Sequence, residues 1–313
     1  MPQALVCMSH SPLLEHTDPP ADVKAAVEES FEAVRKFVKD FDPDLVINFG
    51  PDHYNGFFQD LMPPFCIAYN AHGTGDYDSF DGELNVPTEI AEELAKFLVT
   101  QDLDVAISRK MEVDHGAVQP MEVIYHGDAA AKPMIPVFIN SVAQPFTKVS
   151  RVRKLGAGIG EFFKNSDKKV LFIGSGGLSH DPPVPRFNEA TDEQKKFLVE
   201  GRKPTPEARA ARQQRTIDTA KAFARGEADI MDLNPEWDLA FLDMCRSGDV
   251  ERFDSLVAEE MDAVAGHSSH EVRTWVAAYS ALRACGEYEI TYEFYKPIKE
   301  YIAGFGVTTA VLK

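Results

Sequence analysis

The sequence predicts an α/β fold with a mainly parallel central sheet and helices on both faces. Short, almost wholly apolar runs alternate with longer segments whose apolar residues recur at helical spacing. Runs without apolar–polar alternation indicate strands that are buried on both faces, as in parallel sheets. A polar, helical section at about residues 190–284 follows, and we expect residues 1–313 to form a single catalytic domain.

The first half of the chain supplies most of the expected strands. Residues 3–8 and 45–49 read as buried strands, and residues 23–41 between them carry one apolar helical stripe. Pro136 lies inside the apolar run 134–139, which favours an edge strand or a bulge there. Further helices are expected at 87–100, 116–126 and 152–164, and further strands at 103–108 and 169–173.

The composition changes after Pro182-Pro183. Residues 190–265 are polar and helical, with few strand signals, and a further helix is expected at 269–284. Residues 288–295 read as a late strand. We expect the helical section to pack on the sheet instead of forming an independent unit.

The formal net charge of −18 limits the classes of partner. Nucleic acid and anionic membrane surfaces both require clustered Lys and Arg, so neither is expected as a partner. A small anionic substrate remains compatible with this charge, but it would need a local basic pocket.

The four cysteines and the N-terminus indicate the compartment. No two cysteines form a C-x-x-C pair, so neither a thiolate zinc site nor a redox dithiol is predicted. The first residues lack the basic and apolar regions of a signal peptide, and no run is long enough to cross a bilayer. A reducing cytoplasm is the expected setting.

Four histidines lie where a ligand site of an α/β sheet is expected. His10, His53 and His180 each follow a predicted strand, and His115 lies at the start of a predicted helix. A lone histidine after a strand is more often a loop or capping residue. Several histidines at the same edge of a sheet are expected to converge in space, because ligands bind beyond the carboxyl ends of the strands. The histidines without such placement are taken as surface or structural: His16, His72, His126 and His267.

Two imidazoles and one carboxylate would suit non-haem iron(II). His10 and His53 supply the imidazoles, whereas the carboxylate is less clear. Glu271 is a candidate, but Ser268-x-x-Glu271 also matches a capping box in which the glutamate only closes a helix start. The acidic residues beside the histidines are expected to orient imidazole rings instead: Asp52, Asp114 and Asp181.

Two further motifs have open interpretations. Gly174-Ser175-Gly176-Gly177 lacks the spacing of a phosphate-binding loop, so these glycines are expected to let backbone pass close to a ligand. Residues 51–58 either place aromatic surface beside a ring-shaped substrate or form an ordinary turn followed by core phenylalanines.

The motifs together resemble the class III extradiol ring-cleavage dioxygenases, which include the catalytic subunit of protocatechuate 4,5-dioxygenase. The likeness covers nearly the whole chain and is weakest at 184–230. It rests on Ser9-His10-Ser11-Pro12, Pro51-Asp52-His53-Tyr54-Asn55-Gly56, Val113-Asp114-His115-Gly116, Gly174-Ser175-Gly176-Gly177-Leu178-Ser179-His180, Asn234-Pro235-Glu236-Trp237-Asp238, His270-Glu271 and Ile302-Ala303-Gly304-Phe305-Gly306.

The resemblance implies a function and a role for each site residue. It implies Fe(II) bound by His10, His53 and Glu271, with His115 as proton donor and His180 as proton acceptor. It also implies extradiol cleavage by O2 of a catechol with a carboxylated side chain, such as 2,3-dihydroxyphenylpropionate, by a homo-oligomer. Two alternatives stay open: a zinc-dependent hydrolase on the same fold, or a non-catalytic metal-binding relative.

Overall fold

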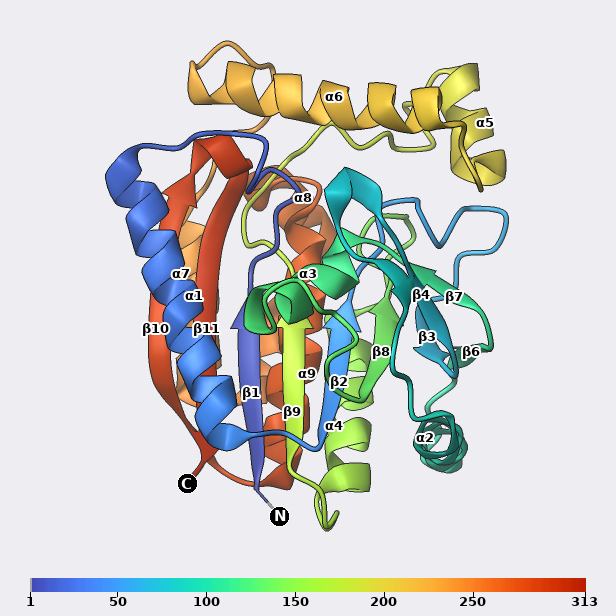
Figure 1. Cartoon of the computed structure of the whole chain (residues 1–313), viewed down its shortest axis with the longest axis vertical. Helices are drawn as coiled ribbons and strands as arrows, with labels where there is room; N and C mark the ends of the chain where they lie inside the picture. Colours follow the sequence, from blue (N-terminus) through green and yellow to red (C-terminus); the bar gives the residue numbers. More distant parts are fainter. Residues whose placement is uncertain (1) are drawn as a thin grey trace.

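A computed structural model describes residues 2–313 and contains one eight-stranded mixed sheet (Figure 1). The strand order is β10-β11-β1-β9-β2-β8-β3-β6, and the four central strands from β1 to β8 run parallel. β11 and β3 pair antiparallel with the outer members of that group. The strands are β1 (Gln3–Met8), β2 (Leu45–Gly50), β3 (Phe65–Ala68), β6 (Ala106–Ser108), β8 (Met134–Ile139), β9 (Val170–Ser175), β10 (Tyr288–Ile298) and β11 (Ala303–Leu312).

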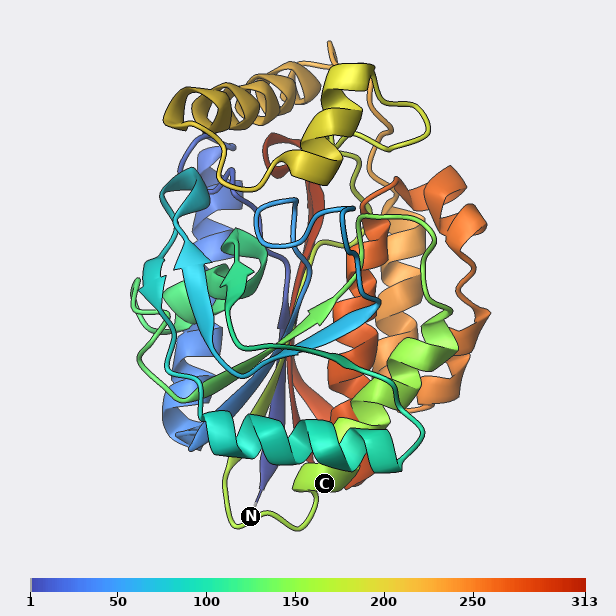
Figure 2. The ribbon, with the colours of Figure 1, turned by 90° about the vertical axis from the view of Figure 1, so that its right-hand side faces the viewer.

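Helices cover both faces of this sheet, as predicted (Figures 1 and 2). α1 and α3 lie on one face, and α4 and α9 lie on the other. The helices are α1 (Ala21–Phe41), α2 (Thr88–Thr100), α3 (His115–Ile124), α4 (Val149–Phe163), α5 (Asp192–Glu200), α6 (Pro206–Ala224), α7 (Pro235–Ser247), α8 (Ala258–Ala265) and α9 (Val272–Cys285), and the 3₁₀ turns are η1 (Asp76–Asp78), η2 (Val250–Ser255), η3 (Ser269–Glu271) and η4 (Lys299–Tyr301).

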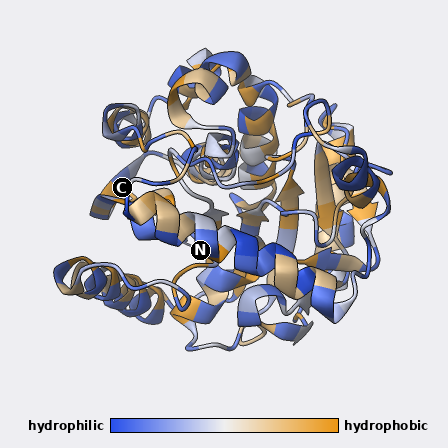
Figure 3. Cartoon of the chain, turned by 90° about the horizontal axis from the view of Figure 1, so that it is seen from above, coloured by the Kyte–Doolittle hydropathy of each residue, from blue (hydrophilic) through white to orange (hydrophobic). Residues whose placement is uncertain are grey.

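The central strands are apolar on both faces because each face meets a helix layer. In β1, Leu5 and Cys7 belong to the core on the α9 side, whereas Val6 and Met8 belong to the core on the α1 side. The helices carry hydrophilic and hydrophobic residues side by side in the view from above (Figure 3), as expected when one helix face meets a core.

α4 and α9 approach each other closely because α4 carries glycine at two positions one turn apart. A Cβ at Gly156 would lie 2.1 Å from the carbonyl oxygen of Ala277, and one at Gly160 would lie 2.1 Å from that of Ala281. This contact holds α9, and with it the residues just before it, against the sheet.

The structure corrects the prediction for Pro136. β8 is an interior strand, not an edge strand, with β2 on one side and β3 on the other. Proline is tolerated because the β3 ladder covers only Val137–Ile139 of β8, so Pro136 lies outside those hydrogen-bonded pairs.

Several strands escaped the sequence analysis. β11 contains two glycines and lacks an apolar run that stands out, yet it pairs with both β1 and β10. A separate three-stranded sheet in the order β5-β4-β7 was also not expected. Its strands are three or four residues long: β4 (Ala71–Thr74), β5 (Asp81–Glu83) and β7 (Met111–Val113).

The predicted helical section divides into two parts. α7 and α8 lie beside α9, whereas α5 and α6 lie across the carboxyl ends of the parallel strands (Figures 1 and 2). Ile217 and Phe223 of α6 share a core with Tyr301 and Ile302 at the start of β11. No helix within residues 2–313 combines the length and the apolar character needed to cross a bilayer.

Candidate active site

Four histidines meet beyond the carboxyl ends of the parallel strands. His10 follows β1, His53 follows β2, His180 follows β9, and His115 is the first residue of α3. The ring centroids of His10 lie 5.3 Å from those of both His53 and His115, which stack on each other at 4.6 Å. The topology thus brings together residues that are up to 170 positions apart in the sequence.

The carboxylate of Glu271 joins three of these imidazoles. Its Oε1 lies 3.0 Å from Nε2 of His53 and 3.1 Å from Nε2 of His180, and its Oε2 lies 3.4 Å from Nε2 of His10. Oε2 also accepts a hydrogen bond of 2.9 Å from the amide of Gly177.

The capping-box interpretation of Glu271 is therefore wrong. Ser268 makes no side-chain capping bond, and the Glu271 carboxylate points to the histidines instead of the helix start. Gly176, directly after β9, allows this placement. A Cβ at Gly176 would lie 2.7 Å from Cβ of Glu271, so a larger residue would push the glutamate away.

Hydrogen bonds fix which nitrogen of His10 carries the proton. Ser175 donates its hydroxyl to the carbonyl of Gly116 at 2.5 Å, and the same oxygen lies 2.9 Å from Nδ1 of His10. Since that hydroxyl has only one hydrogen, it accepts from Nδ1–H of His10. Nε2 of His10 is then left with its lone pair facing Glu271.

The other three imidazoles are held in the same way. Nδ1 of His53 lies 3.1 Å from Oδ2 of Asp114, and Nδ1 of His180 lies 3.0 Å from the carbonyl of Leu178. Nδ1 of His115 lies 2.5 Å from Oδ2 of Asp76. Each partner is an acceptor, so each ring keeps its proton on Nδ1 and presents Nε2 to the site.

The acidic neighbours of the histidines have roles that only partly match the prediction. Asp114 orients a ring, but the ring is that of His53 and not of its neighbour His115. Asp181 holds His267 at 2.6 Å, whereas Asp52 accepts the amides of Asn55, Gly56 and Phe57 and so stabilises a turn.

The environment pulls the pKa values of the site in opposite directions. Burial lowers the pKa of His10 to about 3, although Glu271 opposes this effect. Burial also opposes the charged form of His53, but Asp114 and Glu271 outweigh it and raise its pKa. For Glu271, His180 and His10 outweigh the effect of burial and lower the pKa.

This donor set fits a divalent cation. Nε2 of His53 and Oε1 of Glu271 face each other at 3.0 Å, so either a proton or a cation lies between them. Two ligands about 2.1 Å from one ion and at right angles are separated by about 3 Å, which is the spacing of these atoms. One ligand atom from each of His10, His53 and His115 also lies within 4.8 Å of the others.

A second acidic group is less suited to a cation. Asp76, Asp114 and His115 also bring ligand atoms within 4.8 Å of one another. However, Asp114 already accepts hydrogen bonds from His53, Gly116 and Asn55, and Asp76 already accepts the amide and Nδ1–H of His115. These carboxylates are committed to orienting the rings.

A pocket opens beside the four imidazoles and is walled mainly by apolar and aromatic residues. Its lining includes Tyr54, Asn55, Tyr77, Phe197 and Arg212. Residues 51–58 therefore match both interpretations: Tyr54 and Asn55 line the pocket, whereas Phe58 is buried in a core.

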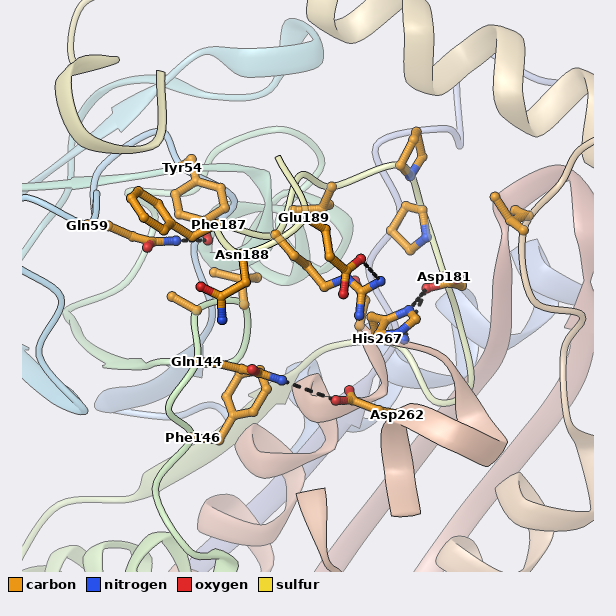
Figure 4. Close-up of a pocket in the computed structure, with 18 of the residues that line it drawn as sticks. Tyr54, Gln59, Gln144, Phe146, Asp181, Phe187, Asn188, Glu189, Asp262 and His267 are labelled. Carbon is orange, nitrogen blue, oxygen red and sulfur yellow. Dashed lines mark hydrogen bonds and ion pairs between the residues drawn. The ribbon is translucent and has the colours of Figure 1, made fainter. Parts of the chain in front are cut away.

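A larger cavity of about 410 Å³ adjoins this pocket (Figure 4). The two share Tyr54 and the segment Pro182–Val184. Asp181 and His267 lie together on one side of the larger cavity, and Tyr54 and Gln59 on another. The chemistry belongs to the smaller pocket, because that pocket contains Glu271 and the four imidazoles.

The remaining histidines lie apart from this centre. His72 is half-buried beside Asp81 and Glu83, and His16 lies 4.0 Å from the carboxylate of Asp78. His126 adopts a positive φ of 51° at the end of the α3 region. His267 is half-buried, bonds to Asp181 and lines the larger cavity, which agrees with the surface or structural placement expected for it.

Asp76, Tyr77 and Arg212 were missed by the sequence analysis. Asp76 lies in a 3₁₀ turn that has no histidine next to it in the sequence, and Arg212 lies within a polar helix. No sequence motif marks any of these three residues, because each reaches the site only when distant segments of the chain meet.

Comparisons with known proteins agree with this geometry. A family model for the catalytic LigB subunit of aromatic ring-opening dioxygenase matches residues 4–308. A protein of Rhodococcus globerulus named 2,3-dihydroxyphenylpropionate/2,3-dihydroxicinnamic acid 1,2-dioxygenase is 73% identical over 313 residues, covering 100% of this chain and 99% of that protein.

Two further relatives carry the same name. The protein of Rhodococcus rhodochrous is 70% identical over 312 residues, covering 100% of this chain and 99% of its own length. That of Azotobacter vinelandii is 47% identical over 306 residues, covering 98% of each chain. With its family match along almost the whole length, the chain belongs to the LigB family of aromatic ring-opening dioxygenases.

Proposed function

We propose that this enzyme is an Fe(II)-dependent extradiol dioxygenase that uses O2 to open the ring of 2,3-dihydroxyphenylpropionate or a similar catechol with a carboxylated side chain. One observation carries the proposal: the Glu271 carboxylate meets Nε2 atoms of imidazoles that hold their protons on Nδ1. The names of the relatives support the choice of substrate.

His10, His53 and Glu271 are the residues that would hold the iron. Two imidazoles and one carboxylate leave other coordination positions open, which is the arrangement typical of non-haem Fe(II) oxygenases. Bound iron supplies the one-electron chemistry through which a catechol can react with O2. The side chains that orient these ligands, Ser175 and Asp114, keep both Nε2 lone pairs available.

His180 is the proposed proton acceptor for a hydroxyl of the substrate. Its Nδ1–H bonds to the Leu178 carbonyl, so Nε2, which lies 3.1 Å from Oε1 of Glu271, is the basic atom of this residue in the pocket lining. A neutral imidazole placed in this way can accept a phenolic proton at neutral pH. Removing the proton makes the catechol oxygen a better ligand and the ring more electron-rich.

His115 is the proposed proton donor for the later bond cleavage. Its Nδ1 contacts the buried carboxylate of Asp76 at 2.5 Å, which fixes the orientation of the ring. His180 has only an uncharged carbonyl at the equivalent position.

A reaction with the proposed substrate tests the function. The purified protein supplied with Fe(II) should turn 2,3-dihydroxyphenylpropionate yellow in air, consume O2 in equal amount to the catechol, and form no product anaerobically. Activity with zinc but without O2 would instead identify a hydrolase. The absence of turnover under every condition, with the metal bound, would identify a non-catalytic relative.

The proposal also covers the cellular compartment, the domain organisation and the oligomeric state of the enzyme. The four cysteines Cys7, Cys66, Cys245 and Cys285 are free, which is compatible with a cytoplasmic protein. We also infer one catalytic domain spanning the chain and a homo-oligomer, both to be tested by limited proteolysis and by light scattering.

A further inference from the structure

We infer that Arg212 binds the carboxylate of the substrate's side chain and thereby makes the enzyme prefer catechols with an acidic side chain. The inference rests on the proposed function and adds to it the residue that selects the substrate. Arg212 lies on α6, the helix that crosses the carboxyl ends of the strands (Figure 1).

The first argument is the position of Arg212. It lines the same pocket as His10, His53, His115, His180 and Glu271. Among residues 2–313, no other arginine and no lysine lines this pocket. A protein with a formal net charge of −18 repels an anionic substrate in general, so a carboxylate needs a local cation to be held.

The second argument is that Arg212 forms no direct ion pair among residues 2–313, although Asp76, Asp114 and Asp52 lie near enough to act on its charge. Its Nη1 donates to the Tyr54 carbonyl at 3.0 Å, and its Nη2 donates to Oδ1 of Asn55. No carboxylate oxygen of residues 2–313 forms an ion pair with it within 4.0 Å. These neutral acceptors orient the guanidinium while leaving its charge and further N–H bonds available.

Burial strengthens this second argument. The guanidinium lies 5.0 Å from the ring centroid of Phe197, and loss of solvent lowers the pKa of Arg212. A guanidinium in such a place gains from a carboxylate more than an exposed one does, because less water competes. Phe197 and Arg212 both come from the α5–α6 section, so that section would contribute to substrate selection.

The neighbouring arginines are less suitable. Arg186 lines the larger cavity next to the pocket, but its guanidinium already pairs with Glu189. Arg202 pairs with Asp60 at 3.2 Å and donates to the carbonyl of Gly56. Arg209, one turn before Arg212, donates to the Thr74 carbonyl and does not line the pocket.

The test compares 2,3-dihydroxyphenylpropionate with 3-propylcatechol, which has a side chain of similar length and no carboxylate. The ratio of kcat/KM for the acid to that for 3-propylcatechol should fall by about 10²-fold in Arg212→Met, mainly through KM of the acid. In Arg212→Lys this ratio should fall less, because lysine keeps the positive charge but lacks the bidentate geometry of the guanidinium.

Two matched variants serve as controls. Arg215→Met removes an exposed arginine from the same helix, and Arg186→Met removes the arginine of the larger cavity. Both should keep the wild-type ratio. An unchanged ratio in Arg212→Met, or its collapse in Arg186→Met, would overturn the inference. Iron content and thermal unfolding of each variant show whether it is folded and loaded.

A measurement on the wild-type enzyme covers the case in which Arg212→Met does not fold. The primary amide of the substrate keeps its shape but lacks the charge, and its kcat/KM should be about 10²-fold lower than that of the acid. Equal values would overturn the role of Arg212 while leaving ring cleavage intact. No consumption of any catechol and O2 by the iron-loaded wild type would instead overturn the proposed function itself.

Discussion

At the scale of single residues, the site depends on the orientation of its imidazoles. Ser175, Asp114, Asp76 and the Leu178 carbonyl each accept Nδ1–H of a different histidine. With the proton fixed on Nδ1, all four Nε2 atoms are free to bind a cation or to exchange a proton with a substrate.

Replacement of Glu271 tests the proposed ligand set. Glu271→Gln removes the negative charge shared by His10, His53 and His180, so the purified variant should lose bound iron and its activity together. Iron would be measured by metal analysis of the protein. His267→Ala is the control, since His267 lines the larger cavity and bonds to Asp181, and it should retain iron. Full iron in Glu271→Gln would contradict the assignment.

Replacement of the two proposed acid–base residues should give a different failure. His115→Ala and His180→Ala should keep iron but slow turnover by about 10²–10⁴-fold, which is the usual contribution of a general acid or base. Single-turnover kinetics and metal analysis of the same samples would separate the two effects. A His180→Ala enzyme with full iron and normal turnover would end its role as proton acceptor.

At the scale of elements, the position of Glu271 depends on how α9 packs. η3 delivers the glutamate directly before α9, and the glycines of α4 let α9 approach the sheet. Thr274 and Trp275 of α9 also donate to the carbonyls of Ser175 and Gly176 after β9. These contacts connect Glu271, from the C-terminal half, to the strand that precedes His180.

Substitution of a glycine in α4 tests this close approach. Gly156→Ala places a Cβ 2.1 Å from backbone of Ala277 and should reduce the free energy of unfolding by about 1–3 kcal/mol, despite the better helix propensity of alanine. Gly158→Ala is the matched control, because its Cβ would meet only the ends of leucine side chains. Urea unfolding of both variants checks the difference, and equal stabilities would show that the helices can separate without cost.

At the scale of the whole molecule, Asp238 of α7 connects parts that are far apart in the chain. Its carboxylate accepts the amide of Ser179 at 2.7 Å and the hydroxyl of Tyr295 at 2.7 Å. A Cβ at Gly304 would lie 2.0 Å from the same carboxylate, so the glycine makes room for it. Burial raises the pKa of Asp238 above its ordinary value of 3.8, and the hydrogen bonds from Tyr295 and Ser179 oppose this only in part.

This raised pKa predicts the sign of a pH effect. The folded protein holds the Asp238 proton more tightly than the unfolded chain, so this residue favours folding most at pH below 3.8. Its contribution decreases as the pH rises through the raised pKa of the folded state. Asp238→Asn does not titrate, so its deficit in unfolding free energy relative to the wild type should shrink with rising pH. A deficit that grows with pH would contradict the prediction.

The sequence by itself determined the fold class, the order of the main elements, the three histidines at the carboxyl ends of strands and a fourth, His115, at the start of a helix. Apolar runs, helical periodicity and proline are local patterns, so they can be recognised in the sequence alone. The short strands β3, β4, β5 and β7, and the glycine-containing β11, were missed because their pairing comes from distant partners.

Only the tertiary structure showed that the Glu271 carboxylate faces the histidines, since a glutamate that closes its own helix start would stand at the same place in the sequence. The contact between Asp76 and His115 and the place of Arg212 in the pocket lining were also visible only in the tertiary structure. The physical reason is that each depends on side chains brought together by sheet order and helix packing, whereas a sequence pattern records only neighbours along the chain.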